Sequence, residues 1–128
     1  MARRYLKRPA ILVDPRMHRI RIYKYTLHLL GDPKHILLIV DPYAQSVTIM
    51  RSEKSDKRAC CLERTLPDNN RSPEIFCRSL IRDLFELNEC WDKSQPYRVY
   101  GTFFSDGCYV KFNLMDSTVF LGEREWQR

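Results

Sequence analysis

Glycine-rich phosphate loops and metal-ligand clusters are missing from this chain of 128 residues. Only four glycines are present, and neither G-x-x-x-x-G-K nor G-x-G-x-x-G occurs. His18, His28 and His35 share no metal-ligand spacing with one another, and no cysteine pair joins them. We therefore expect no cofactor, no metal ion and no catalytic residue.

Long apolar runs are missing as well. The longest one near the amino terminus, Ala10–Val13, is too short for the apolar core of a secretory signal. The five cysteines are odd in number and contain no C-x-x-C pair, which is typical of reduced thiols in a cytosol-like compartment. With 30% charged and 44% hydrophobic residues, the composition predicts one soluble cytoplasmic domain without membrane contact.

Positive charge, in contrast, is concentrated at one end. Residues 1–24 carry eight cationic side chains against Asp14 alone, a net charge of +7, whereas the remaining 104 residues carry 14 basic and 15 acidic groups, a net charge of −1. Lysine and arginine gathered in this way can release counterions from phosphates. We predict a basic amino-terminal arm over residues 1–17, with DNA as the expected nucleic acid. The alternative is a solubilising tail. The predicted contact residues are Arg3, Arg4, Lys7, Arg8, Arg16, Arg19, Arg21 and Lys24.

Apolar spacing in the first half predicts one helix among four strands. Ile20 and Ile22 alternate with charged or polar residues, which indicates a strand with one buried face. Gly31 and the following Asp32-Pro33 can end a short helix. The expected elements are a strand at 19–23, a helix at 25–30, and strands at 36–40, 46–50 and 59–65.

The second half begins after a loop at 67–73. Ser72-Pro73-Glu74 offers a serine cap, a proline at the first helical position and a carboxylate in the first turn. These residues favour one long helix ending near residue 89. The alternative, which the repeat described below favours, is a short strand at 74–78 followed by a helix at 79–89. Asp106-Gly107 then predicts a hairpin between strands at 97–104 and 108–114. A turn at 115–117 and an edge strand at 118–121 complete the expected elements.

Side by side, the halves follow one plan. Each gives the order β-α-β-β-β, over residues 18–66 and 74–121, without residue-level identity between them. The expected fold is therefore a single α+β domain over residues 18–128. It should have a mostly antiparallel sheet, two helices and an internal repeat.

This element order resembles one domain of the sliding DNA clamps of replication, over residues 19–121. The resemblance implies a non-enzymatic module whose helices face the duplex backbone. In this chain, however, the predicted helices hold few cations beyond Lys24, Arg78 and Arg82, and most of the positive charge precedes them.

Residues 19–49 also resemble the swapped-hairpin regulators of the AbrB type. The matching features are RIRI at 19–22, Leu30-Gly31 and the apolar positions 36, 38 and 40. The resemblance implies an interlaced dimer in which Arg19, Arg21 and Lys24 approach DNA. Tyr23 replaces the usual proline, Asp32 stands where an apolar residue is expected, and nothing after residue 50 is explained.

These observations favour a small, intracellular, non-enzymatic protein that associates with DNA in an accessory or regulatory role. One alternative is a protein-interaction adaptor that uses the edge strand at 118–121 or the aromatic hairpin. That hairpin could also stack on unpaired bases, although core packing explains it more simply. Another alternative is an enzyme site assembled from scattered residues, such as a cysteine and a histidine. The hairpin aromatics are Tyr97, Tyr100, Phe103, Phe104, Tyr109 and Phe112.

Overall fold

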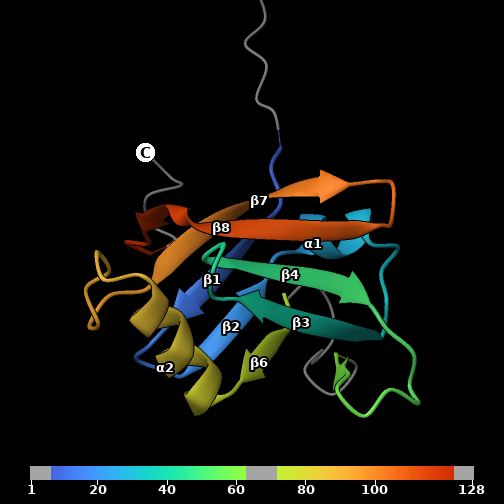
Figure 1. Cartoon of the computed structure of the whole chain (residues 1–128), viewed down its shortest axis with the longest axis horizontal. Coiled ribbons are helices and arrows are strands. Elements are labelled where there is room, and N and C mark those ends of the chain that lie inside the picture. The colour runs from blue at the N-terminus through green and yellow to red at the C-terminus, as the bar shows by residue number, and fades with distance from the viewer. Residues whose placement is uncertain (1–6, 63–71, 123–128) are drawn as a thin grey trace, which may run out of the picture.

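A computed structural model describes residues 7–62 and 72–122 of the chain (Figure 1). Over these residues, eight strands form one antiparallel sheet in the order β5-β3-β4-β8-β7-β1-β2-β6. This confirms the predicted single α+β domain with a mostly antiparallel sheet and two helices. The elements are β1 (Ala10–Asp14), β2 (Arg19–Ile22), α1 (Lys24–Leu29), β3 (His35–Asp41), β4 (Ser46–Arg51), β5 (Cys60–Cys61), β6 (Glu74–Phe76), α2 (Arg78–Leu87), β7 (Tyr97–Phe104) and β8 (Tyr109–Val119).

The sheet curls around one hydrophobic core. In Figure 1, β1 and β2 cross behind β3 and β4, so the inner face of the sheet encloses the space between them. Ile20, Ile49 and Phe112 enter this core from β2, β4 and β8, and all three are fully buried. Leu27 of α1 and Leu84 of α2 join the same cluster. Burying each such side chain stabilises the fold by about 1.5–3 kcal/mol, so packing of this shared core holds the curled sheet together.

Two of the hairpin turns use the same Asp-Pro chemistry. The carboxylates of Asp14 and Asp41 each accept a hydrogen bond from the backbone N–H two residues further on. The fourth turn residue, His18 or Gln45, then adopts a left-handed conformation with φ near 50°. Such side-chain-to-backbone bonds favour a turn over a continued strand, so both turns are specified locally.

The sheet has an internal pseudo-twofold symmetry. Exchanging β1 with β5, β2 with β6, β3 with β7 and β4 with β8 maps nearly every strand pairing onto an observed pairing. The exception is β1–β2, whose counterpart β5–β6 is not formed by the described residues. The axis passes through the pairs Ile20–Ile75 and Thr48–Lys111. The two halves therefore do repeat one strand plan.

The repeat unit differs from the predicted one in its last strand. The first half follows the expected order as β2-α1-β3-β4-β5, but β6-α2-β7-β8 has no strand after it among the described residues. Instead β1 occupies the corresponding place, because β1 lies along β7 as β5 lies along β3. The segments Ala10–Val13 and Ala59–Leu62, with sequences AILV and ACCL, match in this arrangement. Both segments begin with alanine and carry no charged residue, which suits the corresponding strand positions that they occupy.

The prediction of a basic arm over residues 1–17 is wrong from residue 10 onward. Ala10–Asp14 form β1, pair with both β2 and β7, and are buried at all five positions. The prediction followed from the charged residues on both sides of this apolar run. A continuous apolar run, however, is typical of a central strand with both faces covered. Residues 1–6 lie outside the described residues.

The start of the second half follows the short-helix alternative. Glu74–Phe76 form β6 and α2 begins at Arg78, so the favoured long helix from Ser72 is wrong. Residues 74–76 form a strand because they pair with β2, which places Ile75 opposite Ile20 at the edge of the core. The expected strand at 59–65 is observed at residues 60–61, and residues 63–71 of that strand and the following loop lie outside the described residues.

The turn expected at 115–117 is absent, and β8 runs continuously to Val119. Between two successive pairings with β7, β8 advances from Phe112 to Ser117 while β7 recedes from Gly101 to Val99. Five residues therefore oppose two, which makes a large bulge. The polar Met-Asp-Ser sequence marks this bulge, and the predicted separate edge strand at 118–121 is wrong because residues 118–119 pair with β7 within β8.

Candidate nucleic-acid interface

Three arginines lie on the outer faces of β2 and β7, the two strands on either side of β1. The isoleucines of β2 point into the core, so the alternate residues Arg19 and Arg21 face outward. Val99 is likewise in the core and places its neighbour Arg98 on the outer face. Arg21 and Arg98 stand on either side of Leu12, directly across from it on the two neighbouring strands. The strand alternation therefore gathers these cations on one surface.

Two carboxylates hold the arginines of β2 in place. Arg19 Nε lies 3.2 Å from Asp14 Oδ2, and its Nη1 lies 2.6 Å from Glu74 Oε2. Arg21 Nη2 is 3.0 Å from the same Glu74 oxygen, and Arg16 Nε is 3.3 Å from Asp14 Oδ1. Three guanidinium groups thus share two carboxylates, which leaves this network with a net charge of +1.

Asp14 is the most deeply placed member of the network. Its side chain is fully buried at the end of β1. Burial alone raises the pKa of this carboxyl, but hydrogen bonds from Arg16 and the charges of Arg16 and Arg19 outweigh it and lower the pKa below its ordinary value of 3.8. Asp14 therefore stays ionised at neutral pH and positions both arginines.

Arg98 and Arg8 lie over aromatic rings. The Arg98 guanidinium lies over the rings of Tyr23 and Phe120, 5.3 and 5.0 Å from their centroids. Arg8 lies 4.9 Å from the centroid of the Tyr100 ring and also forms an ion pair with Asp116. Such cation–π contacts hold a guanidinium in a fixed orientation without neutralising its charge.

The predicted contact residues are only partly brought together. Arg16, Arg19 and Arg21 meet in the carboxylate network, and Arg8 lies near Arg98 on the neighbouring part of the outer face. The remaining predicted residues are placed as follows: Lys7 lies over the ring of Tyr25, Lys24 begins α1, and Arg3 and Arg4 lie outside the described residues.

Sequence reasoning missed Arg98. The sequence does indicate that Arg98 lies on the outer face of a strand, because Arg98 and Tyr100 alternate with Tyr97 and Val99 along β7. However, the strand order that brings β7 beside β1 cannot be read from this spacing.

The cations on β2, on β7 and in the segments that flank β1 and β2 carry all of the excess positive charge of the described chain. We define the basic surface as seven cationic side chains together with the three acidic side chains Asp14, Glu74 and Asp116. Its net charge is +4. The other residues in 7–62 and 72–122 carry nine cationic and nine acidic groups, and balance. The cations of the basic surface are Lys7, Arg8, Arg16, Arg19, Arg21, Lys24 and Arg98.

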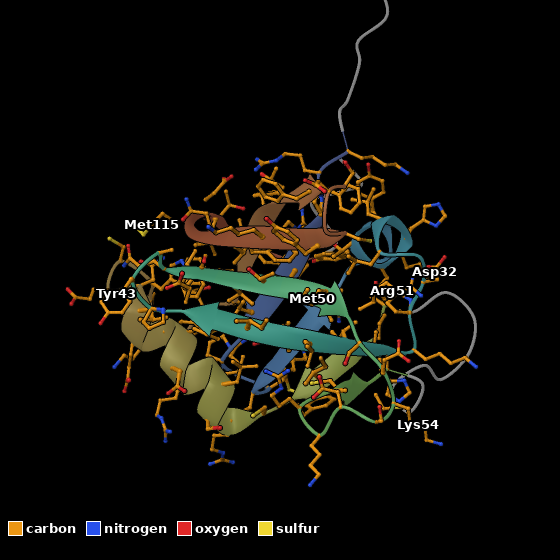
Figure 2. All side chains as sticks on the ribbon, turned by 45° about the vertical axis from the view of Figure 1, so that its right-hand side comes forward. Asp32, Tyr43, Met50, Arg51, Lys54 and Met115 are labelled. Carbon is orange, nitrogen blue, oxygen red and sulfur yellow. The ribbon has the colours of Figure 1, made fainter. Side chains whose placement is uncertain are left out.

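On a different surface, the outer face of β3, β4, β8 and β7, a row of apolar side chains lies beside polar ones such as Thr48 and Lys111. Leu37, Met50, Tyr109 and Phe104 stand opposite one another in a row across the four strands. Phe104 and Tyr109 stack with their ring centroids 5.0 Å apart. Figure 2 shows Met50 on the uncovered front of β4. We call these four residues the apolar row; they include two members of the predicted aromatic hairpin.

Comparison with known proteins gave no matching family, no matching curated protein and no matching solved structure. The resemblances to sliding clamps and to AbrB-type regulators thus stay predictions. Both edges of β2 are paired within this chain, to β1 and to β6, so exchange of β2 between chains would have to break these pairings.

The described residues were also compared with the requirements of metal sites, disulfide bonds and membrane-spanning helices. No cluster of three histidine, cysteine or acidic side chains that could hold a metal ion occurs there. All five cysteines are free. Within the same residues, neither helix has the length and apolar character needed to cross a membrane.

Proposed function

We propose that the chain is a non-enzymatic DNA-associated protein, with an accessory or regulatory role, that binds the phosphate backbone through its basic surface. The observation that carries this proposal is the location of the net charge. The basic surface holds a net +4, while the rest of the described chain is balanced. The phosphate backbone of DNA passing over this surface would be attracted by its net positive charge.

The fixed geometry of the arginines supports the same proposal. Arg19 and Arg21 are held by Glu74, and Arg98 is held over two rings, so these groups lose little side-chain entropy when a phosphate binds. Asp14 and Glu74 also neutralise part of the charge. We therefore expect about four phosphate contacts from the described residues, which corresponds to a slope of log Kobs against log salt of about −4.

The test is a fluorescence anisotropy titration of labelled duplex DNA at several salt concentrations. The double variant Lys7→Gln with Arg16→Gln removes two exposed cations that do not belong to the core. It should weaken binding for every DNA sequence and reduce the steepness of the salt slope by about two. Lys54→Gln is the matched control for loss of one charge, because Lys54 lies on the exposed connector after β4 (Figure 2).

Glu74→Gln tests the sign of the effect. This substitution removes a carboxylate from Arg19 and Arg21 and should increase DNA affinity. The proposal is refuted if the double variant and Lys54→Gln have equal slopes, or if Glu74→Gln leaves DNA affinity unchanged while remaining folded. A single-stranded probe of the same sequence shows whether stacking on exposed rings adds to backbone binding.

The apolar row favours a second candidate function, protein interaction. The partner that we propose for the apolar row is a second copy of the chain, because the four side chains of the row are uncharged and a symmetric pair of copies would bring one row against the other. Light scattering should then give the mass of a dimer, and Met50→Glu should give a monomer. A monomeric wild-type chain at high concentration excludes this candidate.

A further inference from the structure

A cleft lies between α2 and the turn that joins β1 to β2. Its volume is about 340 Å³, within the roughly 300–1,000 Å³ of small-molecule sites. One wall is a single side of α2, because residues three, four and seven positions apart on a helix share a face. The lining residues are Pro15, His18, Arg78, Ile81, Arg82, Phe85, Glu86 and Lys93. We call this space the α2 cleft.

The floor of the α2 cleft is apolar. Ile81 and Phe85 line it and are nearly fully buried, since their other sides pack into the core. Phe85 contacts Trp91 edge-on, with ring centroids 4.9 Å apart, and Trp91 stacks on Tyr97 at 4.8 Å. A flat apolar group placed on this floor would therefore lie one ring away from Trp91.

The rim of the α2 cleft is cationic. Arg78, Arg82 and Lys93 surround the floor, and Glu86 is the one acidic side chain among the lining residues. Among the described residues, Arg78 and Lys93 have no ion-pair partner, and Arg82 has a 3.7 Å contact with its neighbour Asp83, exposed to solvent. Arg16, Arg19 and Arg21, in contrast, are each bound to the carboxylate of Asp14 or Glu74.

We infer that the α2 cleft binds a small organic anion with an apolar body, such as an aromatic or acyl chain ending in a carboxylate, sulfonate or phosphate. The apolar part covers Ile81 and Phe85, and the anionic head lies at the rim near Arg82 and Lys93. An inorganic ion would make no apolar contact with Ile81 and Phe85, and a neutral apolar molecule would make no ionic contact with the cations of the rim. This site is separate from the DNA-binding proposal and does not depend on it.

The test uses anilinonaphthalene sulfonate as the anionic probe and phenylnaphthylamine as its neutral counterpart. Titration of the full chain should show saturable one-to-one binding of the sulfonate, with quenching of the fluorescence of Trp91. The neutral probe should bind less tightly. In the double variant Arg82→Gln with Lys93→Gln, affinity for the sulfonate should fall about tenfold, while affinity for the neutral probe stays the same.

Matched variants separate the α2 cleft from general charge effects. Lys54→Gln changes the charge on the connector and should leave sulfonate binding unaltered, whereas Glu86→Gln should strengthen it. Unchanged near-ultraviolet circular dichroism shows that the variants remain packed. The inference fails if the double variant binds the sulfonate as tightly as wild type, or if both probes respond equally to it. Loss of sulfonate binding on adding duplex DNA would assign the rim to DNA phosphates instead.

Discussion

Replacement of Asp14 by asparagine should weaken the fold more than the same change in the equivalent turn. Asp14 is fully buried and accepts charge-assisted hydrogen bonds from Arg16 and Arg19. Asparagine keeps the shape and one acceptor oxygen, but turns an amide N–H₂ towards Arg19 or loses the bonds from Arg16. Removing one partner of a buried pair costs about 3–5 kcal/mol, and a single hydrogen bond to a charged group contributes about 1.5–3 kcal/mol.

The expected loss for Asp14→Asn is about 2–3 kcal/mol of unfolding free energy. The Arg16 contact is discounted because that side chain is 58% exposed, whereas Arg19 is only 18% exposed and contributes most of the effect. For a domain of this size, such a loss lowers Tm by roughly 6–12 °C. Urea unfolding followed by tryptophan fluorescence measures the free energy directly.

Asp41→Asn is the matched control. Asp41 begins the other Asp-Pro turn and accepts backbone N–H bonds in the same way, but it is exposed and none of the arginines that the structure describes pairs with it. Its substitution should cost less than about 1 kcal/mol. Equal losses in the two variants would show that the arginine network adds nothing to the turn chemistry and would refute the reasoning.

The effect of pH gives an independent check. The pKa of Asp14 is lowered in the folded state, so its ionised form contributes stability that is present above the unfolded-state pKa of about 4. This contribution is lost as the pH falls through the folded-state pKa. The stability difference between wild type and Asp14→Asn should therefore be constant near neutrality and become smaller below about pH 4. A difference that grows in acid would contradict the assignment.

Three further predictions concern packing and thiol chemistry. Gly101→Ala should destabilise the chain by about 1–3 kcal/mol in urea unfolding, because a Cβ there would lie 2.7 Å from the Phe112 ring and 2.9 Å from Val110. Trp91→Phe should cost about 1–2 kcal/mol, since it removes a 2.9 Å hydrogen bond from Trp91 Nε1 to Ser117 Oγ and part of the stack on Tyr97. Cys77 should be alkylated faster than Cys60 in mass-spectrometric time courses. The Ser79 hydroxyl and backbone N–H groups lower the pKa of Cys77, and burial raises that of Cys60; Ser79→Ala should slow the reaction at Cys77.

Local patterns predicted most elements correctly where one face of a strand is buried. The alternation around Ile20 and the continuous apolar run at 36–40 both gave strands within a residue or two of their observed bounds. The Asp106-Gly107 hairpin was also confirmed, with Gly107 at a φ of 100°. In these cases the physical cause, a turn residue or an apolar period, lies within a few positions of the element.

The errors occurred where a distant strand decides the outcome. Residues 74–76 carry good helix-start chemistry, but their pairing with β2, more than fifty residues away, makes them a strand. Ala10–Asp14 were hidden among charges, and their burial depends on β7, which lies almost ninety residues further along the chain. For the same reason Arg98 could not be assigned to the basic surface from sequence. Local propensity is easily overridden by such long-range pairing.

The pseudo-symmetry indicates which features of the basic surface the fold requires. The symmetry places Glu74 and Phe76 where Arg19 and Arg21 stand, and His35 where Arg98 stands. The core residues of the two halves remain apolar, as Ile20 and Ile75 show at the axis. The strand plan thus demands buried apolar residues at the inner positions and leaves the outer positions free. Arg19 and Arg21 stand on β2 in one half and Arg98 on β7 in the other, but the positions related to them by the symmetry hold Glu74, Phe76 and His35. The strand plan therefore does not require an arginine at any of these positions, and the ion pairs with Asp14 and Glu74 are what hold Arg19 and Arg21 in place.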